Sequence, residues 1–284
     1  MLPQKPSRTA FRVASWRAAH QLLERPPLVL DDPLALRILG KEEEARLRAT
    51  AWTGRNRASD AGRSFIVARA RFAEDTLADA VRRGVAQYVV LGAGLDTFAY
   101  RNPYGASLRV FEVDHPATQA WKREQLATTG IELPANLSYA PTDFEKESVA
   151  DGLARAGFSN DAPAFFSWLG VTMYLTEPAL DATLAFIGGT AKGGGVVFDY
   201  MRPLESLPFF ERFVLSFMAR RVARVGEPFR TRLEPAAMHT HLERAGLRIV
   251  EDLDRNAVNA RYFAARADGL RVRTSQARLL AAEI

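Results

Sequence analysis

The spacing of apolar residues along the chain changes near residue 86. Before that point apolar residues recur at helical spacing, most clearly over 9–23 and 64–81, and no strand is predicted. Beyond it, short runs rich in β-branched and aromatic residues alternate with stretches of helical spacing. Such an alternation is typical of a parallel sheet with helices on both faces. The sequence therefore predicts an α/β fold with a helical region at its start.

Five strands are predicted in the alternating region. They cover 87–91, 108–113, 136–140, 164–168 and 196–200, with helical segments near 115–128, 144–156 and 177–190. Farther along, a helix is predicted over 234–245 and two strands over 247–253 and 257–265. Because these two strands are nearly contiguous, we expect an antiparallel hairpin that completes a doubly wound, mostly parallel sheet.

Prolines and phenylalanines set residues 203–233 apart from the alternation around them. They are Pro203, Pro208 and Pro228 with Phe209, Phe210, Phe213 and Phe217. Phenylalanines at spacings of three and four share one face of a helix, so we predict an inserted helical lid, with a core-packing helix as the alternative. The chain is then a single domain of 1–284, with a helical cap (1–85), a cofactor-binding core (86–202), the lid (203–233) and a part that completes the sheet (234–284).

Composition and charge narrow the classes of protein to which the chain belongs. With 284 residues, of which 48% are hydrophobic and 25% charged, it is typical of folded globular proteins. The net charge is +5, but the basic residues are dispersed, so we expect no nucleic-acid partner. No stretch approaches the ~18 apolar residues of a membrane helix, and the first residues lack the apolar segment of a secretory signal. We therefore expect no membrane partner.

Cysteine and histidine restrict the chemistry further. The chain has no cysteine, which excludes thiolate catalysis and disulfides and is compatible with a reducing compartment, so a cytoplasmic location is predicted. Two of the four histidines, His239 and His241, lie two positions apart. On a helix such side chains point about 200° apart, and we expect no metal site.

The clearest local motif is the turn after the first predicted strand. The apolar run 89–91 leads directly into Gly92, Ala93 and Gly94. Glycines let the backbone turn tightly and approach a ligand closely. Asp114 ends the second predicted strand, about twenty residues on, where an acid accepts hydrogen bonds from ribose hydroxyls. These residues predict a nucleotide-type cofactor site, and a tight turn without a ligand is the alternative.

The residue three positions after the second glycine separates two classes of cofactor. A dinucleotide site places a third glycine there, so that the following helix can approach the strand and hold a pyrophosphate. In this chain the position is Thr97. S-adenosylmethionine has no phosphate and makes no such demand. We therefore predict S-adenosylmethionine, and a nicotinamide-dependent oxidoreductase is the rival enzyme class.

Several short motifs follow one another in a fixed order, mostly between residues 7 and 200. They are Ser7–Ala10 with Arg17–Ala18, Asp31–Pro33, Arg69–Phe72, Leu91–Thr97 with Tyr100–Arg101, Phe111–Asp114, Thr142–Phe144, Tyr174–Leu175, and Arg261–Phe263 with Arg266. Together they resemble the bacterial S-adenosylmethionine-dependent methyltransferases of the leucine carboxyl methyltransferase family. The resemblance implies a Rossmann-like methyltransferase fold and S-adenosylmethionine as the cofactor.

The resemblance also implies roles for individual residues. Arg69 matches a position that pairs with the carboxylate of the cofactor's methionine part, and Arg17 matches a second basic position. Gly92, Ala93 and Gly94 match the turn at the methionine end, and Asp114 matches the ribose acid. Asp143 matches the acceptor of the adenine amino group, or alternatively caps a following helix. The other expected cofactor contacts are His115, Phe144 against the adenine ring, Trp168 near the sulfonium, and Leu169.

One residue departs from the pattern of the family. Members most similar to the eukaryotic enzyme have a glutamate that contacts the amino end of the cofactor, and Leu169 occupies that position here. Methylation of a protein carboxyl terminus is therefore not expected. We predict O-methylation of a small-molecule carboxylate or hydroxyl, with a protein that binds the cofactor without catalysis as an alternative. A carboxylate needs no base, whereas a hydroxyl would benefit from His115 or Tyr174, so no catalytic residue is assigned.

Overall fold

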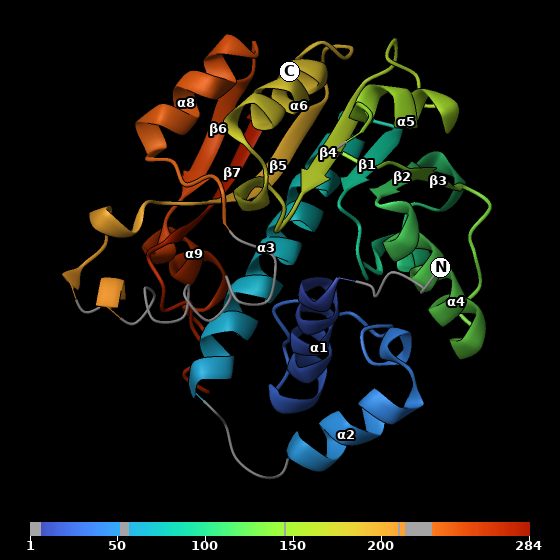
Figure 1. Ribbon diagram of the computed structural model, residues 1–284. Coiled ribbons are helices and arrows are strands. Elements are labelled where there is room, and N and C mark those ends of the chain that lie inside the picture. Colours follow the sequence, from blue (N-terminus) through green and yellow to red (C-terminus); the bar gives the residue numbers. More distant parts are fainter. Residues whose placement is uncertain (1–6, 52–56, 145, 210, 214–228) are drawn as a thin grey trace.

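Seven strands form one mixed sheet at the centre of the protein (Figure 1). The computed structural model describes residues 7–51, 57–144, 146–209, 211–213 and 229–284. The strands are β1 (Gln87–Leu91), β2 (Arg109–Asp114), β3 (Leu137–Pro141), β4 (Ala164–Trp168), β5 (Gly195–Met201), β6 (Arg248–Leu253) and β7 (Ala277–Glu283). Their order is β3-β2-β1-β4-β5-β7-β6; β1 to β5 run parallel, and β7 runs antiparallel to β5 and β6. The predicted fold class is confirmed.

Side chains of the central strands alternate between two apolar layers. On β1, Val89 and Leu91 belong to the core on one face of the sheet, and Tyr88 and Val90 belong to the core on the other. All five residues of β1 are buried. Continuous apolar runs are typical of parallel strands that are covered on both faces, which explains why these strands stand out in the sequence.

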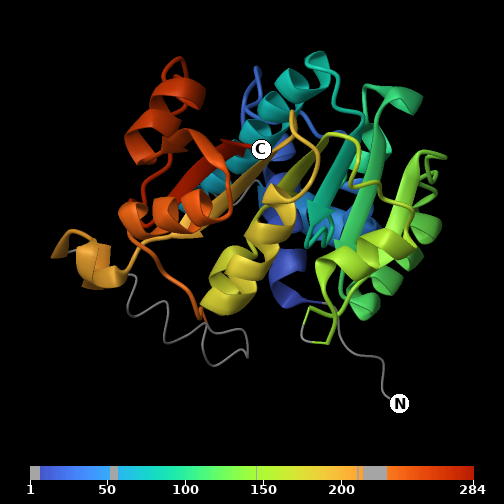
Figure 2. The same ribbon diagram turned by 90° about the horizontal axis from the view of Figure 1, so that it is seen from above.

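Helices cover both faces of the sheet (Figure 2). They are α1 (Arg8–Leu23), α2 (Lys41–Ala51), α3 (Arg57–Arg82), α4 (Pro116–Thr129), α5 (Val149–Arg155), α6 (Glu177–Gly188), α8 (Pro235–Arg244) and α9 (Arg255–Tyr262). The α3 and α9 helices share one core, whereas α5, α6 and α8 share the other. The face that carries α3 is the one on which the candidate site is built.

The first helices lie across the end of the sheet where the parallel strands finish (Figure 1). The α1 helix packs against α3 and α2. The side chain of Ser7, just before the helix, accepts the N–H of Ala10 and forms its N-cap. The short 3-10 helix η1 (Arg37–Leu39) connects α1 to α2 and packs against α4. No strand occurs in the described residues before 86, as predicted.

The structure corrects one predicted strand. Residues 257–265 do not form a strand, because most of this segment belongs to α9, which begins at Arg255. The side chain of Asp254 accepts the N–H of Ala257 and caps this helix. The antiparallel partner of β6 is β7, Ala277–Glu283, which lies farther along the chain. A short apolar run fits both the helical period of about 3.6 residues and the strand period of two, and the cap at Asp254 favours the helix.

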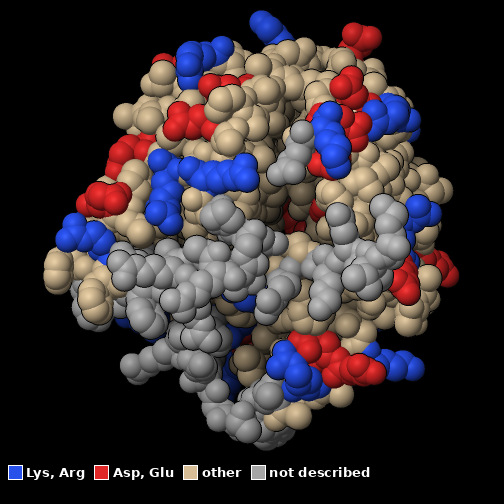
Figure 3. All heavy atoms as spheres, in the orientation of Figure 1, with Lys and Arg blue, Asp and Glu red and all other residues tan. Residues whose placement is uncertain are grey.

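The predicted lid falls partly outside the described residues, which omit Phe210 and Phe217. Phe209 and Phe213 are 76% and 71% exposed, so these two side chains do not pack in the core. On the face shown in Figure 3, basic and acidic side chains of the described residues lie interspersed. None of the described helices combines the length and the apolar character that crossing a membrane requires.

Candidate functional site

The turn after β1 can be built only with glycine. Gly92 and Gly94 have φ angles of +69° and +47°, a region that side chains disfavour. A Cβ atom on Gly92 would lie 2.4 Å from Cγ2 of Val171, and one on Gly94 would lie 3.2 Å from Cβ of Ala10. The N–H groups of Gly92 and Ala93 donate to the carbonyl of Val113 on β2, at 2.8 and 3.1 Å. The turn is therefore fixed in place and packed closely from both sides.

Asp114 is held against this turn at the end of β2. Its Oδ2 accepts the N–H of Gly94 at 2.5 Å, and its Oδ1 accepts the N–H of His115 at 2.6 Å. Burial raises the pKa of Asp114, and the two backbone hydrogen bonds offset this effect only in part. A carboxylate has about four lone-pair sites, so two remain for hydroxyl donors. This geometry suits the predicted contact with a ribose.

A cavity of about 790 Å³ opens beside the turn. It lies between the ends of β1, β2 and β4 and the helices α1 and α3, and its volume is within the range of about 300–1,000 Å³ that small-molecule sites occupy. The predicted site residues that line it are Arg17, Arg69, Gly92, Ala93, Gly94, Asp114, His115, Phe144 and Leu169. Residues from about 7 to 175 thus meet around one space.

Trp168 does not lie at this cavity, which removes it as a candidate neighbour of the sulfonium. It is 1% exposed and packs with Phe198, with 6.3 Å between ring centroids, in the core shared with α6. Its chain neighbours Ser167 and Leu169 line the cavity instead. Successive side chains at a strand point to opposite faces, and the register of β4 turns the indole away.

Asp143 lies beside the cavity rather than on its wall. Its Oδ2 accepts from Nζ of Lys146 at 2.6 Å and is 3.7 Å from Nε2 of His115. His115 and Phe144, its neighbours, do line the cavity. The next helix, α5, is capped by Ser148, so Asp143 is not its N-cap. Its predicted contact with the adenine amino group stays a prediction.

Arg69 is anchored by an acid that the sequence analysis did not identify. Its Nη1 donates to Oδ2 of Asp199 on β5 at 3.0 Å, and Oδ1 of Asp199 accepts the N–H of Gly170 at 2.5 Å. A Cβ atom on Gly170 would lie 2.7 Å from Nη1 of Arg69. Asp199 therefore orients the guanidinium, and the glycine leaves room for it at the cavity wall.

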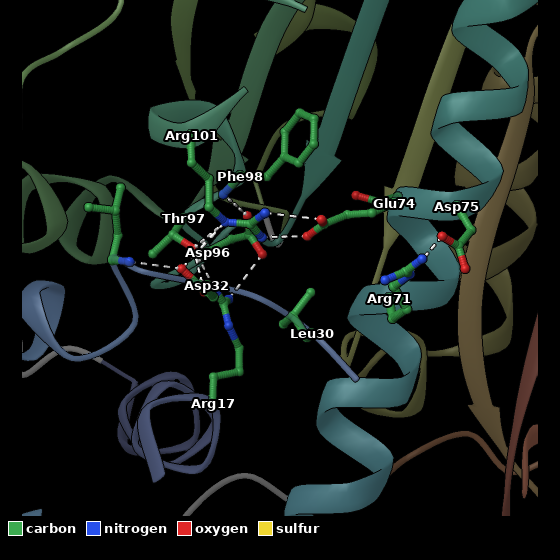
Figure 4. Close-up of polar contacts among 12 residues, drawn as sticks. Arg17, Leu30, Asp32, Arg71, Glu74, Asp75, Asp96, Thr97, Phe98 and Arg101 are labelled. Atoms are coloured by element: carbon green, nitrogen blue, oxygen red, sulfur yellow. Dashed lines mark hydrogen bonds and ion pairs between the residues drawn. The ribbon is translucent and has the colours of Figure 1, made fainter. Parts of the chain in front are cut away.

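Arg17 belongs to a buried network of charges at the other side of the turn (Figure 4). Its Nη2 donates to Asp32 and Thr97, and its Nη1 donates to Asp96 at 3.1 Å. Burial raises the pKa of Asp32, but Arg17 and Arg101 lower it by more, so the net pKa is lowered. The Thr97 hydroxyl also donates to Asp32, at 2.7 Å. Thr97, at the position where a dinucleotide site has a glycine, thus forms hydrogen bonds within this network.

Sequence reasoning missed several polar residues at the cavity. Glu74 and Asp96 line it, as do Tyr88 and Ser167, whose hydroxyls are joined by a hydrogen bond of 2.8 Å. The motifs that carry the family resemblance contain Asp96 and its neighbours Arg101 and Asp32. Membership in these motifs could have identified the three residues as part of the site. Tyr88 and Ser167 lie inside apolar strand runs, where the pattern indicates only burial.

Comparisons with known proteins show the family to which the chain belongs. A family model described as leucine carboxyl methyltransferase matches residues 10–188, which is more than half of the chain. The chain belongs to the leucine carboxyl methyltransferase family. It is 36% identical over 206 residues to YktD of Bacillus subtilis (strain 168), which is provisionally named an S-adenosyl-L-methionine-dependent methyltransferase, and the match covers 72% of this chain and 67% of YktD.

Other relatives of this family member support the same class. A protein of Mycobacterium avium (strain 104) with the same provisional name is 34% identical over 194 residues, or 66% of this chain and 65% of that protein. The matches therefore span about two thirds of the length of these relatives. The crystal structure of a DUF574 family protein from Streptomyces avermitilis MA-4680 has a TM-score of 0.58 at 18% identity, covering 95% of this chain and 96% of that one, and shows that the fold is shared.

The family assigns the chain as an S-adenosylmethionine-dependent methyltransferase and removes the nicotinamide-dependent oxidoreductase from the alternatives. The residues present fit S-adenosylmethionine. Asp114 retains acceptor sites for a ribose, Gly92 and Gly94 line the cavity without a side chain, and Arg69 lines it with an oriented guanidinium. When bound, the cofactor supplies a methyl group that its sulfonium has already activated.

Proposed function

We propose that this methyltransferase methylates an oxygen atom of a small molecule, a carboxylate or a hydroxyl group, and that a carboxylate is the acceptor that the site favours. The observation that carries the proposal is the position of Arg230, which lines the cavity together with Tyr174, Leu175, Thr176 and Ala179. None of these five residues is among the predicted cofactor contacts, so they are available to the acceptor.

The backbone of Arg230 is fixed, while the residue itself is exposed. Its N–H donates to the carbonyl of Met173 at 2.8 Å, so the segment that carries it is tied to the 3-10 helix η4 (Thr172–Tyr174). The ring of Phe229 lies 5.4 Å from that of Tyr174. A cavity lined by both an arginine and a tyrosine suits an acceptor with an apolar body and an anionic oxygen, because Arg pairs with carboxylates through parallel N–H donors.

The chain's part in the reaction is mainly alignment. Methyl transfer needs the acceptor oxygen, the methyl carbon and the sulfur in line, and holding them so in a site with little water supplies much of the rate. An ionised carboxylate has no proton to lose. A hydroxyl acceptor would benefit from a base, for which His115 and Tyr174, both on the cavity wall, are the candidates.

A small-molecule acceptor also agrees with the size of the cavity, about 790 Å³ for cofactor and acceptor together. The cytoplasm is the compartment that we propose for this activity, since a chain without cysteine is compatible with a reducing environment. We keep the helical lid over 203–233 as part of the proposal, since Phe209 and Phe213, two of its described phenylalanines, are exposed rather than packed in the core.

The proposal is tested by transfer of a labelled methyl group to a panel of aromatic and aliphatic carboxylic acids, phenols, alcohols and amines. Products that release labelled methanol in mild alkali are methyl esters, whereas methyl ethers and N-methyl products are stable. Arg230→Met should raise KM for the carboxylates by about tenfold and leave KM for phenols nearly unchanged. Arg244→Met, which makes the same change of charge on the exposed side of α8, is the control. Transfer to amines alone would contradict the proposal.

A further inference from the structure

One face of α3 forms a wall of the cavity. The residues of α3 on this wall are Ile66, Arg69, Ala70, Ala73 and Glu74, which recur at helical spacing. The two charged residues are five positions apart, which is about 7.5 Å along the helix axis. Two alanines lie between them and leave room for a ligand. Five positions also turn about 140° around the axis, so Arg69 and Glu74 stand at the two edges of this wall, with Ala70 and Ala73 between them.

Glu74 faces the cavity with part of its carboxylate available. Both of its oxygens accept from Arg101, with Nη1 to Oε2 at 3.0 Å. The side chain is nevertheless 24% exposed, and the residue lines the cavity. Figure 4 shows Glu74 reaching from α3 toward Arg101, whereas Arg71 and Asp75 pair with each other elsewhere on the same helix. A carboxylate with a bidentate partner keeps about two further lone-pair sites.

The charges around Glu74 do not balance. Among the described residues of this network, the three carboxylates of Asp32, Glu74 and Asp96 face the two guanidinium groups of Arg17 and Arg101. Two further arginines line the cavity: Arg69, which is already paired with Asp199, and Arg230, whose backbone is tied to Met173. Burial also raises the pKa of Glu74 in spite of Arg101, as expected where a negative charge lacks full compensation. A ligand cation beside Glu74 would remove this excess.

The two residues that follow β4 supply no side-chain acceptor for such a cation, and the hydroxyl of Ser167 on β4, which also lines the cavity, already accepts from the hydroxyl of Tyr88. Leu169, which lines the cavity there, is apolar, and the next residue is Gly170. Both carboxylate oxygens of the nearby Asp199 already accept hydrogen bonds, one from Arg69 and the other from the N–H of Gly170. The acid on α3 is therefore better placed than the end of β4 to receive a cation.

We propose that Glu74 binds the ammonium group of the methionine part of S-adenosylmethionine, while Arg69 binds its carboxylate. Because the ammonium and the carboxylate are bonded to one α-carbon, the long side chains of Arg69 and Glu74 then converge on it from the two edges of this wall, above Ala70 and Ala73. This contact selects an amino-acid-bearing ligand over a simple nucleoside thioether. It concerns the cofactor alone, and its test needs no acceptor, so it stands or falls separately from the proposed O-methylation.

The test compares four ligands by calorimetric titration of the protein without acceptor. They are S-adenosylhomocysteine, its analogue without the amino group, its analogue without the carboxylate, and 5′-methylthioadenosine, which has neither. Glu74→Gln should weaken the two ligands that carry an ammonium by about tenfold or more, because a charge-assisted hydrogen bond is lost. The other two ligands should keep their affinity. Asp75→Asn, the next residue and paired with Arg71, is the matched control and should change none of the four.

Loss of Glu74 also leaves Arg101 without its bidentate partner, so a second variant separates folding from binding. Glu74→Gln combined with Arg101→Gln removes both charges and lets the two amides pair. This double variant should show the same selective loss for ligands that carry an ammonium. Equal weakening of all four ligands would make Glu74 a purely structural residue and overturn the proposal, as would unchanged affinity for all of them.

Discussion

The guanidinium of Arg69 on α3 and the carboxylate of Asp199 on β5 lie 3.0 Å apart, although the residues are 130 positions apart in sequence. The same carboxylate accepts the N–H of Gly170 just after β4. One acid therefore fixes a helix side chain and a loop backbone at the cavity wall. The guanidinium is oriented before any ligand arrives, which reduces the entropy that binding must offset.

This relationship predicts a selective effect of Arg69→Met. Affinity for S-adenosylhomocysteine should fall by about tenfold or more, because the charge-assisted hydrogen bonds to its carboxylate are lost. Affinity for 5′-methylthioadenosine, which has no carboxylate, should change little. Arg71→Met, two residues on and half exposed, is the control and should bind both ligands normally. Equal losses for the two ligands would assign Arg69 a structural role only.

Asp114 should act on every ligand that contains the ribose. Asp114→Ala is expected to weaken both S-adenosylhomocysteine and 5′-methylthioadenosine by about tenfold, in contrast to Arg69→Met. Titration calorimetry of the two variants with the two ligands measures this difference. An unchanged dissociation constant for Asp114→Ala would remove this residue from the site.

Asp114 also predicts a pH dependence of binding. The ionised carboxylate accepts the ribose hydroxyls, so its protonation weakens the complex. Burial raises its pKa above the ordinary value of 3.8, and the N–H groups of Gly94 and His115, with Lys122 and His115 as nearby cations, offset this only in part. Affinity for 5′-methylthioadenosine should therefore fall as pH decreases through a value above 3.8. Asp114→Asn should lose this dependence; if the variant keeps it, another group is titrating.

Gly92→Ala should be more damaging than its backbone angle alone explains. The new Cβ would meet Val171 at 2.4 Å, and φ is +69°. Gly246 has a φ of +75° with no atom near its Cβ position, so Gly246→Ala isolates the backbone strain. We expect Gly92→Ala to cost about 1–3 kcal/mol more in the free energy of unfolding, measured in urea. Adding Val171→Ala should recover part of that difference, and no recovery would argue against the clash.

Trp168 should matter for stability rather than for binding. Trp168→Ala is expected to lower the free energy of unfolding by about 3–5 kcal/mol, because a buried indole leaves a cavity in the core. The folded fraction should bind S-adenosylhomocysteine with unchanged affinity, whereas Leu169→Ala, one residue on and at the cavity, should weaken it. If Trp168→Ala, at a temperature where it is folded, bound S-adenosylhomocysteine more weakly, the indole would have a role in the cofactor site.

The sequence determined the parts of this protein that depend on local patterns. Continuous apolar runs are imposed by burial on both faces of a parallel sheet, so the central strands β1, β4 and β5 could be placed from the chain alone. The edge strand β3 is only partly buried and was placed by the alternation around it. The glycine turn and Asp114 could be predicted because each lies at the end of a predicted strand, where residues of these types form a nucleotide-type cofactor site. The error at residues 257–265 arose where a short apolar segment fits two periods, and the cap at Asp254 set the outcome.

Only the tertiary structure decided which polar groups meet. Nothing in the sequence indicates that Arg69 pairs with Asp199 or Glu74 with Arg101, since these partners are 130 and 27 residues apart. The register of β4 turned Trp168 into the core and Ser167 toward the cavity, and a shift by one residue would have exchanged them. Local periodicity reports whether a side chain is buried, but its partner is set by how distant elements pack.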